Sequence, residues 1–422
     1  MVMHPKKRQL CSTLISRYEV KTAGNFSARL LTINTSADAE RELLRIKVDP
    51  AGIGMMAPKM FSRSVHLGGV SCGQANILKQ EMLSLGGDAA VARGTVTCSI
   101  EQTDVILIGT EKQLRKLCRK LNEQPFGLSS LAADIESLLA STSIAPGIWK
   151  TSRREISLSR PLIMGILNVT PDSFSDGRNF HDQQRAIDRA LEMAAQGADI
   201  IDIGGESTRP GAEPVSADEE AMRVLPVIER LSGLLPCPIS VDTWKSSVAC
   251  AALKAGAEIV NDISGFTFDP EMAVVAANTG AGVVLMHTRG TPANMQADTV
   301  YDDLMGEVIS GLRQSVGLAI QAGVQREQIT LDPGVGFGKD LNGNLEIIRR
   351  LRELAGLGFP LLLGTSRKNF IGKVLGKDAG ERIFGTAATI ALAIANGAAI
   401  LRVHDVAEMR DVADVTQAVI SG

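Results

Sequence analysis

The second half of this 422-residue chain places polar side chains able to do chemistry at the ends of short apolar runs. In chain order they are Asn168, Glu206, Asp242, Asn261 with Asp262, His287, Asp332, Lys368 and His404. Buried carboxylates cost free energy unless they are paired. The neighbouring strand ends do not carry three basic residues that could pair with Asp242, Asn261 and Asp332. A flat ligand with several N–H groups, such as a 2-amino-4-oxo pyrimidine ring, would satisfy these acceptors. Asp242 or Asp332 alone could instead cap a following helix or turn, but the three residues together favour a binding site.

A second group of residues is cationic and suits phosphate. It consists of Arg209, Arg367, Lys368, Arg402 and His404. The segment from Ser366 also opens a helix, whose N-terminal amides favour an anion. Asn168, Asp172 and Asp176 supply oxygen donors near these cations, and few carboxylates beside phosphates suit Mg²⁺. The glycine-rich segment 332–339 is not a P-loop, because it lacks the spacing and the Lys-Ser/Thr end of that motif.

Eight apolar runs must position these side chains. They are residues 161–168, 198–206, 238–242, 257–262, 282–287, 328–332, 360–368 and 398–404. Helix-patterned chain between them indicates repeated strand–helix units. Eight such units close into a (β/α)8 TIM barrel with its active site at the C-terminal strand ends. The sequence therefore predicts an α/β enzyme, with two long polar loops, 170–182 and 207–216, as candidate mobile lids.

A barrel takes about 250 residues, so residues 151–422 are assigned to it and residues 1–150 to a smaller N-terminal α/β domain with a linker near 141–150. In this domain we expect strands at 28–34 and 104–110 and helices at 36–46, 73–87, 111–122 and 128–140. It has no P-loop and no G-x-G-x-x-G after a strand, which favours a packing or oligomerisation domain. Its 19 Lys and Arg against 13 Asp and Glu contrast with 25 against 34 in the barrel. The basic residues are scattered, so we predict no nucleic-acid binding.

The cysteines and the apolar stretches bear on localisation. The six cysteines show no C-x-x-C pair and are expected to be free thiols in a reducing compartment. The start of the chain is too polar for a signal peptide. Residues 386–403 are apolar enough to suggest a membrane span, but Asn396-Gly397 fits a helix end followed by a buried strand better. We therefore predict a soluble, cytoplasmic protein without membrane contact.

Seven sequence blocks resemble the dihydropteroate synthase family. They are GILNVTPDSFSDG (165–177), DIGGESTRPGA (202–212), SVDT (240–243), NDISG (261–265), LDPGVGFGK (331–339), GTSRK (364–368) and RVHDV (402–406). They occur in the family's order within residues 153–420, and as a set they are highly specific. The resemblance implies a transferase that joins 4-aminobenzoate to 6-hydroxymethyl-7,8-dihydropterin diphosphate in folate biosynthesis and releases pyrophosphate. It also implies sulfonamide inhibition and a homodimer.

The resemblance also implies roles for individual residues. The pterin would contact Asp242, Asn261, Ile263, Met286, Asp332, Phe337 and Lys368. The diphosphate would lie on Asn168, Arg209, Arg402 and His404, with Mg²⁺ on Asn168 and Asp176. The 4-aminobenzoate would sit among Phe174, Thr208, Arg209, Pro210, Lys368 and Asn369. The loop residues of the catalytic face would be Thr170, Asp172, Phe174, Asp176, Thr208, Arg209 and Pro210.

The sequence departs from the family in two places, and two rival functions are weighed against it. Asn369 stands where many members have Ser, which puts the affinity for aminobenzoate and sulfonamides in doubt, and loop 1 reads DGRNF where DGG is usual. The N-terminal domain lacks the acid and His pattern of the pyrophosphokinase often fused to this enzyme. A pterin-binding methyltransferase barrel would share the Asp–Asn–Asp pocket but needs none of the loop motifs. A non-catalytic pterin-binding protein would have lost loop acids or rim cations, and none is lost here.

Overall fold

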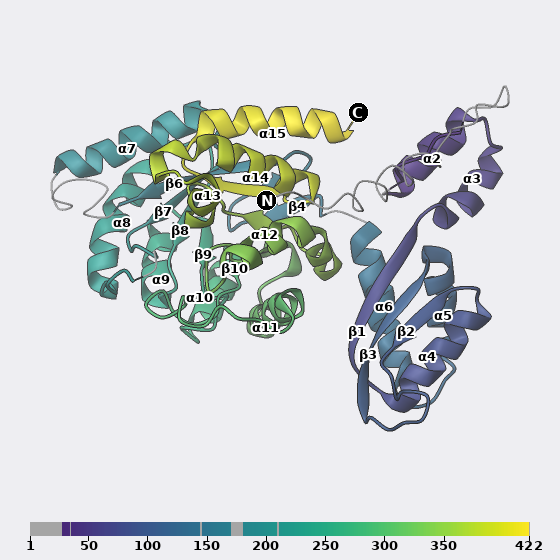
Figure 1. The fold of residues 1–422 in the computed structure, drawn as a ribbon. Coiled ribbons are helices and arrows are strands. Elements are labelled where there is room, and N and C mark those ends of the chain that lie inside the picture. The colour runs from purple at the N-terminus through teal and green to yellow at the C-terminus, as the bar shows by residue number, and fades with distance from the viewer. Residues whose placement is uncertain (1–27, 34, 144–145, 170–179, 209–210, 422) are drawn as a thin grey trace, which may run out of the picture. The chain divides into compact units, whose positions relative to one another are not determined.

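The chain divides into two units, Met1–Phe126 and Gly127–Gly422 (Figure 1). The structure is a computed structural model that describes residues 28–33, 35–143, 146–169, 180–208 and 211–421. The sequence places the boundary at residue 150, whereas the packing of the chain places it after Phe126. Helix α6 (Leu128–Ser143) therefore belongs to the barrel unit.

The N-terminal unit is a three-stranded antiparallel sheet with helices. Its elements are α2 (Ser36–Arg45), α3 (Pro50–Met56), η2 (Ala57–Lys59), β1 (Ser62–Ser71), α4 (Cys72–Ser84), β2 (Asp88–Val91), β3 (Gln102–Thr110) and α5 (Glu111–Leu121). The strand order is β1-β3-β2, with β3 antiparallel to both neighbours. Ser71 and Thr110 cap α4 and α5, each in a capping box with a glutamine three residues on.

One strand prediction for this unit is wrong, and strand β1 has no sequence prediction. Residues 28–33 form no strand, and their apolar Leu30 and Leu31 are exposed. Strand β1 lacks an apolar run, because only two of its residues, Val65 and Val70, are buried. The sequence pattern therefore did not indicate it. The predicted strand at 104–110 and the helices at 36–46, 73–87 and 111–122 are confirmed by β3, α2, α4 and α5.

The prediction that all six cysteines are free is also wrong. Cys72 and Cys98 form a disulfide, with their Cα atoms 5.6 Å apart. Cys72 begins α4 and Cys98 lies in the loop between β2 and β3, so tertiary folding brings together residues that are 26 apart in sequence. No local spacing motif could have indicated this pair. Cys237 and Cys250 are free thiols.

The barrel unit contains the eight predicted parallel strands. They are β6 (Leu162–Asn168), β7 (Ile200–Gly204), β8 (Ile239–Asp242), β9 (Ile259–Asp262), β10 (Gly282–Met286), β11 (Ile329–Asp332), β12 (Leu362–Leu363) and β13 (Ile400–Val403). The sheet order is β11-β10-β9-β8-β7-β6-β13-β12, and a parallel bridge from Leu331 to Leu361 closes the ring. The strands are buried on both faces, as parallel strands under helices must be.

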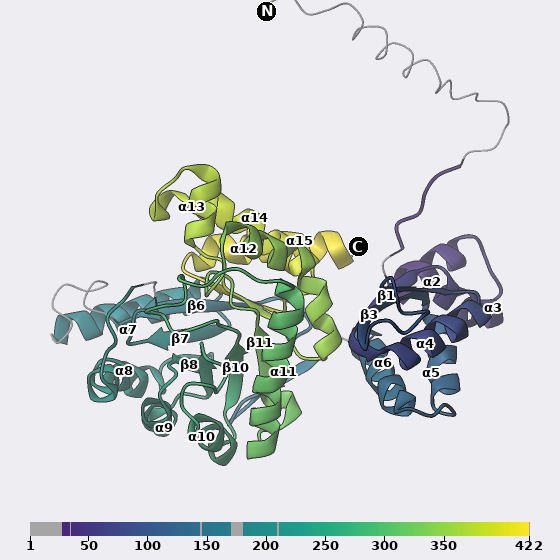
Figure 2. The ribbon, with the colours of Figure 1, turned by 60° about the horizontal axis from the view of Figure 1, so that its bottom comes forward.

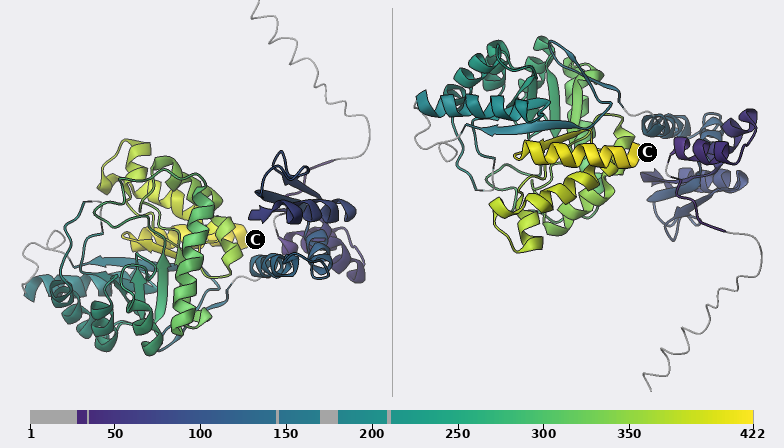
Figure 3. Two further views of the ribbon diagram at one scale, coloured as in Figure 1. Left: turned by 90° about the horizontal axis from the view of Figure 1, so that it is seen from below. Right: turned by 90° about the horizontal axis from the view of Figure 1, so that it is seen from above.

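Helices surround these strands (Figures 2 and 3). They are α7 (Phe180–Ala195), α8 (Ala217–Leu231), α9 (Ser246–Ala255), α10 (Met272–Thr279), α11 (Leu304–Ala322), α12 (Leu341–Arg350), α13 (Asn369–Leu375), α14 (Ile383–Ala395) and α15 (Val406–Ser421), with short 3₁₀ segments η3 (Arg326–Gln328), η4 (Leu351–Leu357) and η5 (Ala379–Glu381). Residues 386–403 divide into the end of α14 and β13, as predicted. No helix in the described part of the chain is long and apolar enough to cross a membrane.

A small hairpin closes the N-terminal end of the barrel. Strand β4 (Ile148–Lys150) lies in the region expected to be a linker and pairs antiparallel with β5 (Glu155–Ser157), which follows that region. Trp149 is fully buried among interior residues of the barrel strands, including Met164, Ile200 and Ile259. Its indole N–H donates to the Gln328 carbonyl at 2.8 Å. The hairpin is therefore part of the barrel core.

Candidate active site

The C-terminal strand ends bring predicted site residues next to one another. The strand register pairs Asn168 with Gly204, Gly204 with Asp242, Asp242 with Asn261, and Met286 with Asp332. A β-carbon at Gly204 would lie 3.5 Å from Cβ of Asp242 and 3.7 Å from Oδ1 of Asn168. The absence of a side chain at Gly204 therefore lets Asn168 and Asp242 share one side of the barrel mouth.

Arg402, at the end of β13, connects two buried carboxylates. Its Nε donates to Asp202 Oδ2 at 2.6 Å and its Nη2 to Asp242 Oδ2 at 2.5 Å. Burial by itself would lower the pKa of Arg402, but Asp202 and Asp242 raise it, so the guanidinium stays charged. Burial raises the pKa of Asp242 to about 7, and Arg402 opposes this rise.

The second oxygen of Asp242 is available to a ligand. Oδ1 of Asp242 is buried and accepts no hydrogen bond from any residue that the structure describes. A buried acceptor without a donor is costly, so native structures that keep one commonly use it for a ligand or a water. No helix cap uses Asp242, and its alternative role as a local cap is not observed in the described residues.

Asp202 is a site residue that sequence analysis missed. It is fully buried, and its Oδ2 accepts from Arg402 and from Asn261 Nδ2, the latter at 3.1 Å. Asp202 lies two residues beyond Ile200, which faces the barrel interior, so alternation along β7 places it on the same inward face. A carboxylate within a run of isoleucines was the available signal, because a buried charge requires partners.

Asp332 and Lys368 lie on another side of the barrel mouth. Asp332 Oδ1 accepts from the Gly334 backbone N–H at 2.7 Å. One of its two oxygens therefore caps the following turn, which is the alternative role considered for Asp332 from the sequence. Lys368 Nζ donates to the Val335 carbonyl and lies 4.4 Å from the centroid of the Phe337 ring. Burial raises the pKa of Asp332 and lowers that of Lys368 to about 8, while each charge opposes the shift of the other.

Another lysine, the buried Lys339, holds the glycine-rich loop after β11. Its Nζ donates to the Phe337 carbonyl at 2.8 Å and lies 3.1 Å from His287 Nδ1. Burial lowers the pKa of Lys339 to about 7 and that of His287 to about 3, so the imidazole is neutral. Gly334 has a φ of +70°, and a β-carbon there would lie 1.9 Å from the His287 carbonyl oxygen. Only glycine fits this turn.

The rim after β12 and β13 differs from the sequence interpretation in one respect. Ser366 Oγ accepts from the His404 backbone N–H at 3.2 Å and lies 3.0 Å from His404 Nδ1. Arg367, expected to be a phosphate-facing cation, instead donates through Nε and Nη2 to Asp405. Its charge is therefore neutralised within the protein, and the expectation that it belongs to the cationic group is not met.

Glu206 anchors the loop after β7. It accepts from the Val215 backbone N–H at 2.9 Å, from Trp244 Nε1 at 3.1 Å and from Lys245 Nζ at 2.9 Å. Lys245 also donates to the fully buried Glu220, whose pKa burial raises. The sequence singled out Glu206 as a strand-end residue. Its observed contacts are with the protein.

The remaining predicted residues fall into two groups. Ile263 and Met286 are buried at strand ends, Thr208 is half-buried, and Asn369 is exposed as the first residue of α13, whose N-cap is Lys368. Six predicted loop residues lie outside the residues that the structure describes: Thr170, Asp172, Phe174, Asp176, Arg209 and Pro210.

The donor set near Asn168 fits Mg²⁺ better than a metal caged by protein alone. Among the described residues, no group of three or more His, Cys, Asp or Glu side chains could hold a metal ion. Mg²⁺ commonly takes one or two protein oxygens and fills its remaining positions with water and substrate phosphate. The amide oxygen of Asn168, beside Gly204 at the mouth, is a donor of this kind.

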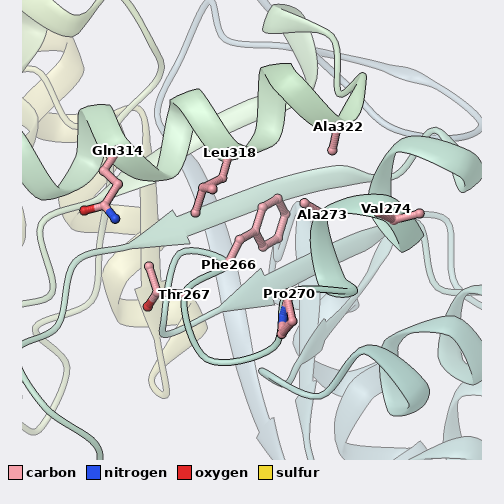
Figure 4. A pocket seen from close by; sticks show the side chains of 8 residues that line it. All are labelled: Phe266, Thr267, Pro270, Ala273, Val274, Gln314, Leu318 and Ala322. Carbon is pink, nitrogen blue, oxygen red and sulfur yellow. The ribbon is translucent and has the colours of Figure 1, made fainter.

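A pocket of about 340 Å³ lies between α10 and α11, and none of the strand-end residues described above lines it (Figure 4). It is lined by Phe266, Thr267, Pro270, Ala273, Val274, Gln314, Leu318 and Ala322. None of these side chains is ionisable, so the pocket offers no acid, base or charge for catalysis. The strand-end residues remain the candidate site.

The fold and the site define a pterin-binding barrel enzyme. The family model described as pterin binding enzyme matches residues 164–404. A dihydropteroate synthase from Synechocystis sp. is 54% identical over 260 residues, covering 61% of this chain and 90% of that protein. Dihydropteroate synthases from Yersinia pestis and Xanthomonas albilineans, solved with a sulfonamide drug and with 4-aminobenzoic acid, are each 42% identical with a TM-score of 0.62. They cover 65% and 66% of this chain, and the chain covers 100% of each. The chain belongs to the pterin-binding enzyme family and, within it, to the dihydropteroate synthases.

Similarity to known proteins also extends over the N-terminal unit. A probable bifunctional folylpolyglutamate synthase/dihydropteroate synthase from Halobacterium salinarum is 42% identical over 413 residues, which is 98% of this chain. The chain spans about half of the length of that relative (50%). The N-terminal unit is thus shared with a protein that carries a further segment.

Proposed function

We propose that the barrel unit condenses 4-aminobenzoate with (7,8-dihydropterin-6-yl)methyl diphosphate to give 7,8-dihydropteroate and pyrophosphate. The observation that carries the proposal is the buried Oδ1 of Asp242, which has no hydrogen-bond partner among the described residues; Asp242 pairs with Asn261 at the barrel mouth, where β11 also ends in Asp332. The pterin ring supplies several in-plane N–H groups, which match these acceptors. Lys368 is the donor on the other side of the pocket, while Ile263, Met286 and Phe337 supply apolar contact.

The diphosphate is proposed to bind at Asn168, Arg209, Arg402 and His404. Arg402 has five N–H donors and uses two groups on Asp202 and Asp242, which leaves others for phosphate oxygens. Ser366 Oγ already accepts from the His404 backbone N–H, so its own proton is free to go to Nδ1. The ring proton of His404 then lies on Nε2, as a donor to the diphosphate.

Asn168 and Asp176 would hold Mg²⁺ beside this diphosphate. The bound cation would neutralise charge on the leaving group. The C–O bond between the methylene and the diphosphate breaks, and the dihydropterin ring delocalises the developing positive charge. The neutral amine of 4-aminobenzoate then forms the new C–N bond and loses a proton. The protein's contribution is orientation, charge stabilisation and exclusion of water, which would otherwise capture the cation.

The 4-aminobenzoate is proposed to lie among Phe174, Thr208, Arg209, Pro210, Lys368 and Asn369. Asn369 is exposed at the start of α13, where a side-chain amide can donate to a carboxylate in place of a serine hydroxyl. The solved relatives that hold 4-aminobenzoic acid and a sulfonamide drug support this substrate and this class of inhibitor. We expect affinity for both to be altered by Asn369 but not lost.

We also propose that the protein is a cytoplasmic homodimer. Helix α14 exposes Phe384 and Leu392, which are eight residues apart on one face, and the neighbouring α15 exposes Val415 and Val419. Figure 3 shows these two helices side by side. An exposed apolar surface on adjacent helices suits a self-complementary interface between two copies.

A pyrophosphate-release assay tests the function directly. With both substrates and Mg²⁺ we expect release that stops when either substrate is left out or when the metal is chelated. The Asp242→Asn variant serves as the matched control, because it removes the proposed pterin acceptor without changing side-chain size. No release from the folded wild-type protein with Mg²⁺ present would contradict the proposal.

A further inference from the structure

Arg367 has a backbone conformation that its residue type disfavours. Its φ is +58°, in the left-handed region where glycine is the usual residue. It is the third residue of a turn that is closed by a hydrogen bond from the Lys368 N–H to the Thr365 carbonyl at 3.2 Å. An arginine in this conformation costs free energy, so other contacts of the residue must stabilise it.

Three contacts hold Arg367, one from Asp405 and two from α14 and its N-cap residue. Its guanidinium makes the two-pronged contact with Asp405, which follows His404 at the end of β13. Its backbone N–H donates to Thr386 Oγ1 at 3.2 Å, and its carbonyl accepts from Arg382 Nη1 at 2.9 Å. Thr386 is fully buried in α14. Side-chain and backbone contacts together therefore determine the turn.

The turn aims its two flanking residues at different parts of the site. Ser366, on one side of Arg367, contacts His404 through its hydroxyl. Lys368, on the other side, donates to the Val335 carbonyl beside Asp332. Lys368 is held by Val335 in the glycine-rich loop, whereas Ser366 is held by His404, in the same loop that Asp405 joins to the turn. The Arg367–Asp405 pair thus joins the loop after β12 to the loop after β13.

We propose that Arg367 is a positioning residue that fixes Ser366 against His404 and so sets the diphosphate end of the site. The proposal rests on the function proposed above for His404 and Arg402. Nε and Nη2 of Arg367 are used by Asp405, so the role proposed for this side chain is to hold the turn and not to bind substrate. Its loss should disturb the diphosphate end of the site and spare the pterin end.

The test compares Arg367→Ala and Asp405→Asn with Arg160→Ala. Arg160 forms a two-pronged pair with Asp199 at the opposite end of the barrel, with donor–acceptor distances of 2.5 and 3.2 Å. Its side chain is 49% exposed, close to the 43% of Arg367. It is a matched control for the loss of a half-exposed Arg–Asp pair.

Two readouts separate this proposal from the function on which it rests. Calorimetry with inorganic pyrophosphate and Mg²⁺ should show about tenfold weaker binding in Arg367→Ala and Asp405→Asn, and wild-type binding in Arg160→Ala. Affinity for a pterin ligand should stay within about threefold in all three variants. Turnover should fall at least tenfold in the first two variants only. Arg367→Lys should give an intermediate loss, because an ammonium cannot make the two-pronged contact.

The outcomes are distinct. Wild-type pyrophosphate affinity in folded Arg367→Ala would overturn the positioning role, and so would an equal loss in Arg160→Ala. If the wild-type protein releases no pyrophosphate from its substrates but the binding pattern holds, the proposed function fails and the positioning of the anion site stands.

Discussion

The two units of the molecule differ in which polar side chains they bury. Among the described residues of the N-terminal unit, the buried polar side chains are those of Thr95 and Thr103. The barrel unit buries carboxylates and lysines, including Asp202, Asp242, Asp332 and Lys339. Buried charges cost free energy and persist mainly where a site requires them. The difference in buried charges therefore indicates that the catalytic residues lie in the barrel unit.

The ion pairs of the two units differ in the same way. On α5 of the N-terminal unit, Arg115 pairs with Glu111 at 2.6 Å, but the arginine side chain is 43% exposed. Such surface pairs contribute about 0–1 kcal/mol. In the barrel, Arg402 lies between Asp202, which is fully buried, and Asp242. Removing a partner from this network should be far more costly than removing one from α5.

The largest expected effect on stability concerns Trp149. Trp149→Ala should lower the unfolding free energy of the barrel by about 3–5 kcal/mol, because it empties the space between the interior strand residues. Both tryptophans of the chain lie in the barrel unit. In the variant only Trp244 remains, so its fluorescence during denaturant unfolding reports the unfolding of the barrel unit alone. Leu107→Ala, at a fully buried position of β3, is the control and should leave this transition in place. An unchanged midpoint for Trp149→Ala would show that the hairpin is not part of the barrel core.

Loss of pterin affinity is the next largest effect. Asp332→Asn and Asp242→Asn should each weaken pterin binding at least a hundredfold, about 2.7 kcal/mol, because an amide replaces the acceptor that faces ring N–H groups. Arg209→Ala and Asp176→Ala should mainly lower turnover, because these residues are assigned to the diphosphate and to Mg²⁺ and not to the pterin. Calorimetry and pyrophosphate release measure the two quantities. Asp104→Asn, at an exposed position of β3, should change neither, and normal pterin affinity in Asp332→Asn would refute the pocket assignment.

Titration of Asp242 gives a smaller effect. Oδ2 of Asp242 is bound by Arg402, so a proton goes to Oδ1, the proposed acceptor for the pterin. With a pKa of about 7, the carboxyl is mostly protonated at pH 6. Pterin affinity should therefore fall about tenfold from pH 8 to pH 6, because the deprotonated fraction of Asp242 falls by about that factor once the pH is one unit below the pKa. The Asp242→Asn variant should lack this slope. A flat profile in the wild-type protein would exclude Asp242 as the titrating acceptor.

The same group predicts the opposite trend for the stability of the ligand-free protein. The folded pKa of Asp242, about 7, lies above the reference value of about 3.9 for an unfolded chain. Its contribution to stability is therefore fully present below about pH 4 and is lost as the pH rises through 7. The barrel should unfold more easily at pH 8 than at pH 6, by an amount that Asp242→Asn removes.

The sequence predicted the parts of the molecule that depend on local pattern. Apolar runs that end in polar residues indicated all eight barrel strands, and the positions of Asp242, Asn261 and Asp332 at the strand ends placed them at one mouth. The features it missed depend on tertiary contacts. The Cys72–Cys98 disulfide joins distant segments, and Trp149 lies in a stretch whose Pro and Gly suggested a linker. The neutralisation of Arg367 by Asp405 also required the relative position of two loops.

The smallest effect is expected from removing the N-terminal unit. A protein starting at Gly127 keeps α6 and the Trp149 hairpin, and every proposed catalytic group follows Pro161. Its turnover should stay within about threefold of the whole chain. A protein starting at Thr151 loses Trp149 and should be unstable, so the two starts distinguish a core defect from a catalytic one. Light scattering on both would show whether the removed unit affects oligomer state. If the Gly127 protein stays folded but loses more than about a hundredfold in turnover, roughly 2.7 kcal/mol of transition-state stabilisation, the N-terminal unit contributes to catalysis. The catalytic residues would then not all lie in the barrel unit.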